Sequence, residues 1–76
     1  MNKRIRPVYP TLSAEIGRAG ITRREIAGRL GITPGSVSRK INGKIGFMLS
    51  EAAKIKEMLG VDMPIEELFR RIDDDY

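Results

Sequence analysis

Positive charge is the feature of this sequence with the clearest chemical meaning, because it is concentrated in one half of the chain. Residues 1–44 contain ten Lys or Arg side chains and two acidic ones, whereas residues 45–76 contain four basic and eight acidic side chains. Ammonium and guanidinium groups bind phosphates, and a basic half of a small chain points to a polyanionic partner. The charge distribution therefore indicates nucleic acid, with a solvated basic surface as the simpler alternative.

The residue types on which most catalysis and metal binding depend are absent. The 76 residues include no His and no Cys. This removes the commonest general base near neutral pH, the commonest metal ligand and any thiol nucleophile or disulfide. The clustered Asp73, Asp74 and Asp75 have the pattern of a solvated tail. We therefore expect no enzyme, no catalytic residue, no metal, no cofactor and no small-molecule ligand.

A helix-turn-helix is predicted over residues 22–44. Thr22, with Glu25 three positions later, has the pattern of a capping box. Gly31 stands where a helix ends in a left-handed residue, and Thr33 can cap the second helix. The apolar residues at helical spacings that we expect to face the core are Ile26, Ala27, Leu30, Val37 and Ile41. Two short capped helices joined by a tight turn are typical of this motif.

All of the predicted secondary structure is helical. The expected helices cover residues 11–19, 22–30, 34–41, 51–59 and 65 to about 72. Ser50 is the expected N-cap of the fourth helix, and Arg70 and Arg71 are expected in the last turn of the fifth. No segment alternates as a strand does, so the predicted fold class is all-α, a compact five-helix bundle. No apolar run approaches the roughly 18 residues of a membrane span, and we expect a cytoplasmic protein without membrane contact.

Three parts are predicted along the chain. Residues 1–9 form a basic N-terminal arm, residues 10–72 the helix-turn-helix domain and residues 73–76 an acidic tail. Pro7 and Pro10 disfavour a helix in the arm. Two interpretations of the arm stay open: it contacts a DNA backbone or minor groove, or it is a frayed terminus.

Several runs of residues carry a resemblance to a known family. These runs are Gly20–Ala27, Leu30–Thr33 and Ser36–Lys44, with a downstream stretch between Phe47 and Phe69. In residue types and spacing they resemble the XRE-type helix-turn-helix of phage Cro and CI repressors, which has the lambda repressor-like DNA-binding fold. The resemblance implies a five-helix bundle that binds double-stranded operator DNA sequence-specifically, usually as a homodimer, and has no catalytic activity.

The resemblance also implies that the helix over residues 34–41 enters the major groove. The implied base contacts are Pro34, Gly35, Ser38 and Arg39. Pro34 and Gly35 have no side-chain donor or acceptor, so Arg39 is the first candidate for reading a base, because a guanidinium can donate two hydrogen bonds to guanine. The candidates for phosphate contact are Arg23, Thr33, Ser36, Lys40, Asn42 and Lys44.

The favoured function is a sequence-specific transcriptional regulator of the Cro repressor type, from a phage or prophage, that associates with the nucleoid. The candidates for a self-complementary dimer patch are Phe69, Ile72 and Tyr76. The other interpretation of these apolar residues is closure of the monomer core. The alternative function is a protein-interaction module of the same fold, an antitoxin or phage accessory factor without specific DNA readout. The Pro34–Gly35 pair keeps that alternative open.

Overall fold

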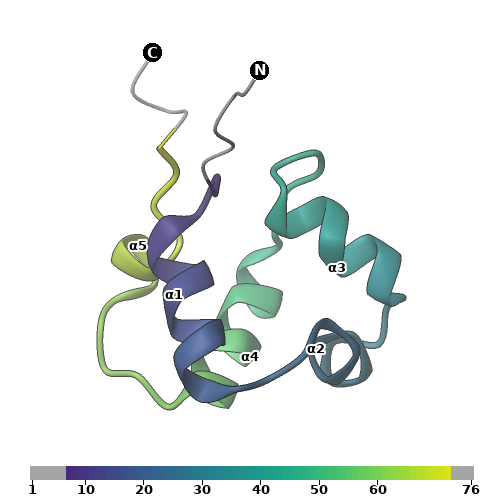
Figure 1. The fold of residues 1–76 in the computed structure, drawn as a ribbon, viewed down its shortest axis with the longest axis horizontal. Coiled ribbons are helices and arrows are strands. Elements are labelled where there is room, and N and C mark those ends of the chain that lie inside the picture. Colours follow the sequence, from purple (N-terminus) through teal and green to yellow (C-terminus); the bar gives the residue numbers. More distant parts are fainter. Residues whose placement is uncertain (1–6, 73–76) are drawn as a thin grey trace.

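The computed structural model describes residues 7–72 and forms five α-helices within them. These are α1 (Pro10–Ala19), α2 (Arg23–Leu30), α3 (Pro34–Ile41), α4 (Leu49–Leu59) and α5 (Ile65–Leu68). No strand occurs in the range that the structure describes. Figure 1 shows α1 and α5 together on one side, α4 behind them, and the α2–α3 pair on the other side. The predicted all-α fold is confirmed.

The core draws one fully buried side chain from every helix. These are Leu12 of α1, Ile26 of α2, Val37 of α3, Ile55 of α4 and Leu68 of α5. Complete burial of such a side chain contributes about 1.5–3 kcal/mol through the hydrophobic effect. Because α2 and α3 each supply one of the five, the helix-turn-helix is part of the same core as the rest of the chain.

The predicted N-cap of α4 is wrong. The helix begins at Leu49, its N-cap is Met48, and Ser50 lies inside the first turn. The backbone N–H of Met48 donates to Oε1 of Glu51 at 2.9 Å. The carboxylate of Glu51 therefore satisfies a free donor at this helix end, and the helix starts two residues earlier than a cap at Ser50 would allow.

The predicted length of α5 is also wrong. The helix ends at Leu68 instead of continuing to about Ile72, so Arg70 and Arg71 lie beyond it. The backbone N–H of Ile72 donates to the carbonyl of Val8 at 3.0 Å. The Ile72 N–H therefore has its partner in the N-terminal segment instead of in a fourth-residue helical bond, a contact that helical periodicity cannot reveal.

Three aromatic rings join the two ends of the described chain to the loop after α3. Tyr9, Phe47 and Phe69 pack edge to face, with ring centroids 5.0–6.0 Å apart. The half-buried ring of Phe47 thus packs against the core beneath the loop after α3. Such pairs add about 0.5–1.5 kcal/mol beyond area burial.

Within residues 7–72, no helix has both the length and the apolar character needed to cross a membrane. The longest of them, α4, has 11 residues.

Candidate nucleic-acid interface

Side-chain caps set the start of both helices of the α2–α3 pair. Thr22 Oγ1 accepts the N–H of Glu25 at 3.1 Å, and Glu25 Oε1 accepts the N–H of Thr22 at 2.8 Å. This is the predicted capping box. Gly31 ends α2 in the left-handed region with φ 74°, and Thr33 Oγ1 accepts the N–H of Ser36 at the start of α3. The predicted helix-turn-helix is confirmed down to its caps.

One face of α3 is exposed while the opposite face is buried. Val37 and Ile41, four residues apart, point into the core. Pro34, Gly35 and Arg39, which lie outside the arc of the helix surface that Val37 and Ile41 occupy, are exposed, and Ser38 is half-buried. All four implied base contacts therefore share the outward side of a helix of 8 residues, which is the arrangement that insertion of a helix into a major groove requires.

Arg23 and Ser38 lie side by side on this face, although they are 15 residues apart in sequence. Arg23 is the first residue of α2, and its Nη1 donates to Oγ of Ser38 at 2.9 Å. A guanidinium carries five N–H donors, so most of them remain for an anion. The sequence suggested Arg23 for phosphate and Ser38 for bases separately, and no spacing rule links the two. Their contact depends on how α2 packs against α3.

Thr33 and Ser36 form a second polar pair at the N-terminal end of α3. Besides accepting the Ser36 N–H, Thr33 Oγ1 donates to Ser36 Oγ at 3.1 Å. The hydroxyl proton of Ser36 is then left to donate outward. An anion at the start of α3 would thus meet the Ser36 hydroxyl, whereas Pro34 has no N–H and the Ser36 N–H is already bonded to Thr33.

Lys40 occupies a different place from the other phosphate candidates. It is 8% exposed, and it is the one charged residue classed as buried within residues 7–72. Its Nζ donates to the carbonyl of Gly46 at 2.9 Å and lies 3.1 Å from Oε1 of Glu51. The ammonium therefore faces the loop between α3 and α4 instead of solvent, where a phosphate would approach.

Glu51 was not foreseen as the partner of Lys40, because 11 residues and a loop separate them. Burial raises the pKa of the Glu51 carboxyl, but the hydrogen bond from the Met48 N–H and the nearby ammonium of Lys40 outweigh it, with a smaller contribution from Lys54. The net effect is a pKa below the ordinary value of a glutamate. The carboxylate is thus held in its charged form beside Lys40.

The turn that follows α3 presents Asn42 and Lys44 to solvent. Its geometry depends on Gly43, which has φ 79°. A Cβ at this glycine would lie 3.0 Å from Nη2 of Arg71 and 3.1 Å from Cγ1 of Val8. The Lys44 N–H donates to the carbonyl of Arg39 at 2.8 Å and closes the turn. The positions of Asn42 and Lys44, the two phosphate candidates that follow α3, therefore depend on the left-handed backbone of Gly43 and on its close neighbours.

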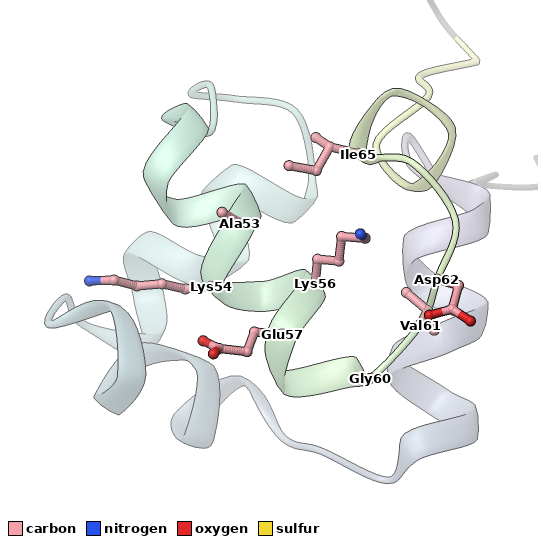
Figure 2. A pocket seen from close by; sticks show the side chains of 8 residues that line it. All are labelled: Ala53, Lys54, Lys56, Glu57, Gly60, Val61, Asp62 and Ile65. Carbon is pink, nitrogen blue, oxygen red and sulfur yellow. The ribbon is translucent and has the colours of Figure 1, made fainter.

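A surface hollow lies elsewhere, around α4 and the loop to α5. It measures about 610 Å³ and is lined by Ala53, Lys54, Lys56, Glu57, Gly60, Val61, Asp62 and Ile65. Figure 2 shows Lys56 extending to one side of α4 and Lys54 and Glu57 to the other. These polar groups do not converge, and none of the α3 candidates lines the hollow.

No cluster of three or more potential metal ligands occurs in residues 7–72. Asp73, Asp74, Asp75 and Tyr76 lie outside the described residues, as do residues 1–6 of the arm. The expectations for the arm and the tail therefore stay predictions.

A comparison of the sequence with known protein families agrees with this geometry. The profile described as a Cro/C1-type HTH DNA-binding domain matches residues 11–74. The chain belongs to this family, and the resemblance to XRE-type proteins is confirmed. No curated protein and no solved structure matches the chain. The protein is therefore a DNA-binding regulator of the helix-turn-helix class, and the match points to a non-enzymatic role.

Proposed function

We propose that the protein is a sequence-specific transcriptional repressor of the Cro type, from a phage or prophage, that inserts α3 into the major groove of double-stranded DNA. The observation that carries this proposal is the exposed side of α3, where Arg39 lies among the implied base contacts. Within residues 7–72, no hydrogen bond or ion pair holds the Arg39 side chain, so its guanidinium is available to a base. Arg23, bonded to Ser38 beside it, supplies a phosphate contact.

The remaining contacts fall around this face. Thr33 and Ser36 lie at the start of α3, and Asn42 and Lys44 follow its end. Contacts at both ends of a recognition helix fix its register along the groove, while the base contact selects the sequence. The proposed base reader is thus Arg39, with phosphate contacts from Arg23, Thr33, Ser36, Asn42 and Lys44.

A selection from a random duplex library tests the proposal directly. We expect a two-fold symmetric consensus with half-sites one helical turn apart, about 34–36 Å. The competing function is a protein-interaction module, favoured by the lack of side-chain donors at Pro34 and Gly35. Failure to enrich any sequence, together with no salt-dependent binding to random duplex, would support that module and reject the repressor.

A second copy of the chain is the proposed partner on DNA, because one α3 covers only a half-site. Phe69 and Ile72 are half-buried, and Tyr76 lies outside the described residues. The large apolar side chains most exposed in residues 7–72 lie instead in the segment after α3, namely Ile45 (41%), Met48 (64%) and Leu49 (73%). Met48 and Leu49 also line a groove of about 370 Å³ that Phe69 borders. Their exposure supports a dimer contact at this segment, which we propose in place of Phe69, Ile72 and Tyr76.

Sedimentation of the protein with and without a selected duplex tests this contact. We expect Met48→Ser with Leu49→Ser to abolish two-copy binding to a palindrome while a half-site is still bound. The matched control is Ile72→Ser, outside the segment, which should leave the two-copy complex in place. If Ile72→Ser abolishes the two-copy complex and the double variant does not, the dimer contact lies at Phe69, Ile72 and Tyr76, as the sequence suggested.

A further inference from the structure

Lys40 is the feature of the DNA-binding half that the proposed contacts leave unexplained. It belongs to α3, yet its ammonium is buried among groups from the following loop and α4. A buried charge costs free energy unless it is paired and hydrogen-bonded. Here the pairing is complete, since Nζ has a carbonyl and a carboxylate within 3.1 Å and lies 6.0 Å from the centroid of the Phe47 ring.

Both members of the ion pair are shielded from solvent. The side chains of Lys40 and Glu51 are 11% and 12% exposed, whereas those of the surface pair Arg29–Glu57 are 48% and 71% exposed. Screening by water and salt reduces an exposed pair to almost nothing, but it affects a shielded pair much less. The Lys40–Glu51 contact is therefore the ion pair that can hold two elements in one geometry.

The elements that this contact joins are the last turn of α3 and the first turn of α4. Figure 1 shows α3 at the edge of the molecule, beside α2 and remote from α1 and α5. Glu51 also accepts the Met48 N–H, and Lys40 also holds the Gly46 carbonyl. One cluster thus joins the end of α3, the loop over residues 42–48 and the start of α4. Replacing buried ion pairs often leaves stability unchanged, and their best-attested role is to specify geometry.

We propose that Lys40 is a positioning residue for DNA recognition: with Glu51 and the Gly46 carbonyl it forms a clasp that sets the orientation of α3 and of the Lys44 turn relative to α4. This proposal rests on the proposed DNA-reading function of α3. In the clasp, Lys40 acts through Arg39 and Lys44 and does not itself touch a phosphate. The specificity of the protein then depends on Glu51, an acidic residue that faces away from the exposed side of α3.

Glu51→Gln gives the sharpest test, because electrostatics and the clasp predict opposite results. Removing a negative charge from a DNA-binding protein strengthens its attraction to DNA. Loss of the clasp instead weakens binding to the selected duplex. We expect Glu51→Gln to lose about 10-fold or more in affinity for the selected duplex, within the range of one lost base contact, and to keep its affinity for random duplex. Glu66→Gln removes the same charge from an exposed site on α5 and should bind both duplexes at least as tightly as the natural protein.

Lys40→Met separates positioning from phosphate contact through the salt dependence. Each phosphate contact contributes about −0.9 to the slope of log K against log salt. We expect Lys40→Met to weaken selected binding with an unchanged slope, whereas Lys44→Ala should flatten the slope by about one unit on both duplexes. Circular dichroism confirms that each variant is folded. If Lys40→Met does not fold, Glu51→Gln and Lys40→Arg, which keeps the charge but not the ammonium geometry, provide the same comparison.

Three outcomes are decisive. Selected binding that is unchanged in Glu51→Gln and Lys40→Met overturns the clasp and leaves the proposed function intact. A slope that flattens in Lys40→Met as it does in Lys44→Ala overturns it as well, and makes Lys40 a phosphate contact. If the natural protein selects no duplex at all, the repressor proposal fails first, and the role of Lys40 in DNA recognition fails with it.

Discussion

Two parts of this small bundle are held together in different ways. The reading unit, α2 and α3 with the turn through Lys44, is ordered by contacts between residues close in sequence, such as the Thr22–Glu25 capping box and the Thr33 cap. The supporting unit is α1, α4 and α5 with residues 7–9 and 69–72. It is ordered by contacts between distant residues, such as the Ile72–Val8 hydrogen bond. A short recognition motif can thus be encoded locally, while its orientation depends on the unit beneath it.

The two units meet at two kinds of contact. The core side chains Ile26 and Val37 pack with residues of the supporting unit, and the Lys40–Glu51 pair joins α3 to α4. The core contributes most of the stability, because apolar burial is large and non-directional. The ion pair fixes the orientation of α3 relative to α4, because the Lys40 ammonium and the Glu51 carboxylate must meet at hydrogen-bond distance. Perturbing the core should therefore unfold both units together, while perturbing the polar contacts should change DNA reading first.

The largest expected effect comes from the core of the supporting unit. Leu68→Ala empties the single fully buried position of α5 and should lower the free energy of unfolding by about 2–5 kcal/mol. Urea denaturation measures this loss. Leu49→Ala makes the same chemical change at a side chain that is 73% exposed, and a surface change of this kind should stay within about 0.5 kcal/mol. Equal losses in the two variants would contradict the assignment of Leu68 to a shared core.

The second largest expected effect is a loss of DNA affinity when Arg39 is removed from the exposed side of α3. Arg39→Ala should weaken binding to the selected duplex by about 1–3 kcal/mol and relax specificity at one base step. The free energy of unfolding should hardly change, because Arg39 is exposed and lies outside the core. Repeating the duplex selection with the variant measures the specificity. An unchanged consensus would remove Arg39 from base reading.

A backbone substitution tests the turn at which the two units touch. Gly43→Ala places a Cβ at φ 79°, close to Arg71 and Val8 of the supporting unit, and the left-handed conformation alone should cost about 1–2 kcal/mol. Gly28→Ala is the matched control, since nothing lies within 4 Å of its added Cβ in α2. That change should stabilise the protein by up to about 1 kcal/mol. Thermal unfolding distinguishes the two variants, and a Gly43→Ala protein at least as stable as the natural one would show that the turn has no special requirement for glycine.

The smallest effect is the pH dependence of the ion pair. Because the pKa of Glu51 is lowered in the folded protein, its contribution to stability is complete above the pKa of the unfolded chain and is lost as the pH falls through the folded pKa. The charged groups that face the carboxylate are Lys40 and Lys54. Glu51→Gln should therefore be less stable than the natural protein at neutral pH, with a difference that shrinks under acidic conditions. A difference that grows on acidification would contradict the sign of the shift.

The reading unit could be predicted almost completely from the sequence. Its caps, its turn glycine and the spacing of Ile26, Ala27, Val37 and Ile41 are local signals, and all four of these side chains are buried. The supporting unit was less predictable. The run Ile65, Leu68, Phe69 and Ile72 has helical spacing, but the helix ends at Leu68. Periodicity indicates which residues are apolar, and it does not show where backbone groups find partners in another segment.

The sequence by itself determined the class of this protein: an all-α chain with a helix-turn-helix, a basic half and a Cro/C1-type family match. Caps, helical spacing and charge depend on residues that are close in sequence, so they can be recognised without the tertiary structure. Only the tertiary structure decided the roles of particular polar side chains. Lys40 and Arg39 are adjacent cations on one helix, yet the first is buried against Glu51 and the second is exposed. The difference arises from the packing of α3 on the rest of the bundle, which directs one residue inward and its neighbour towards solvent.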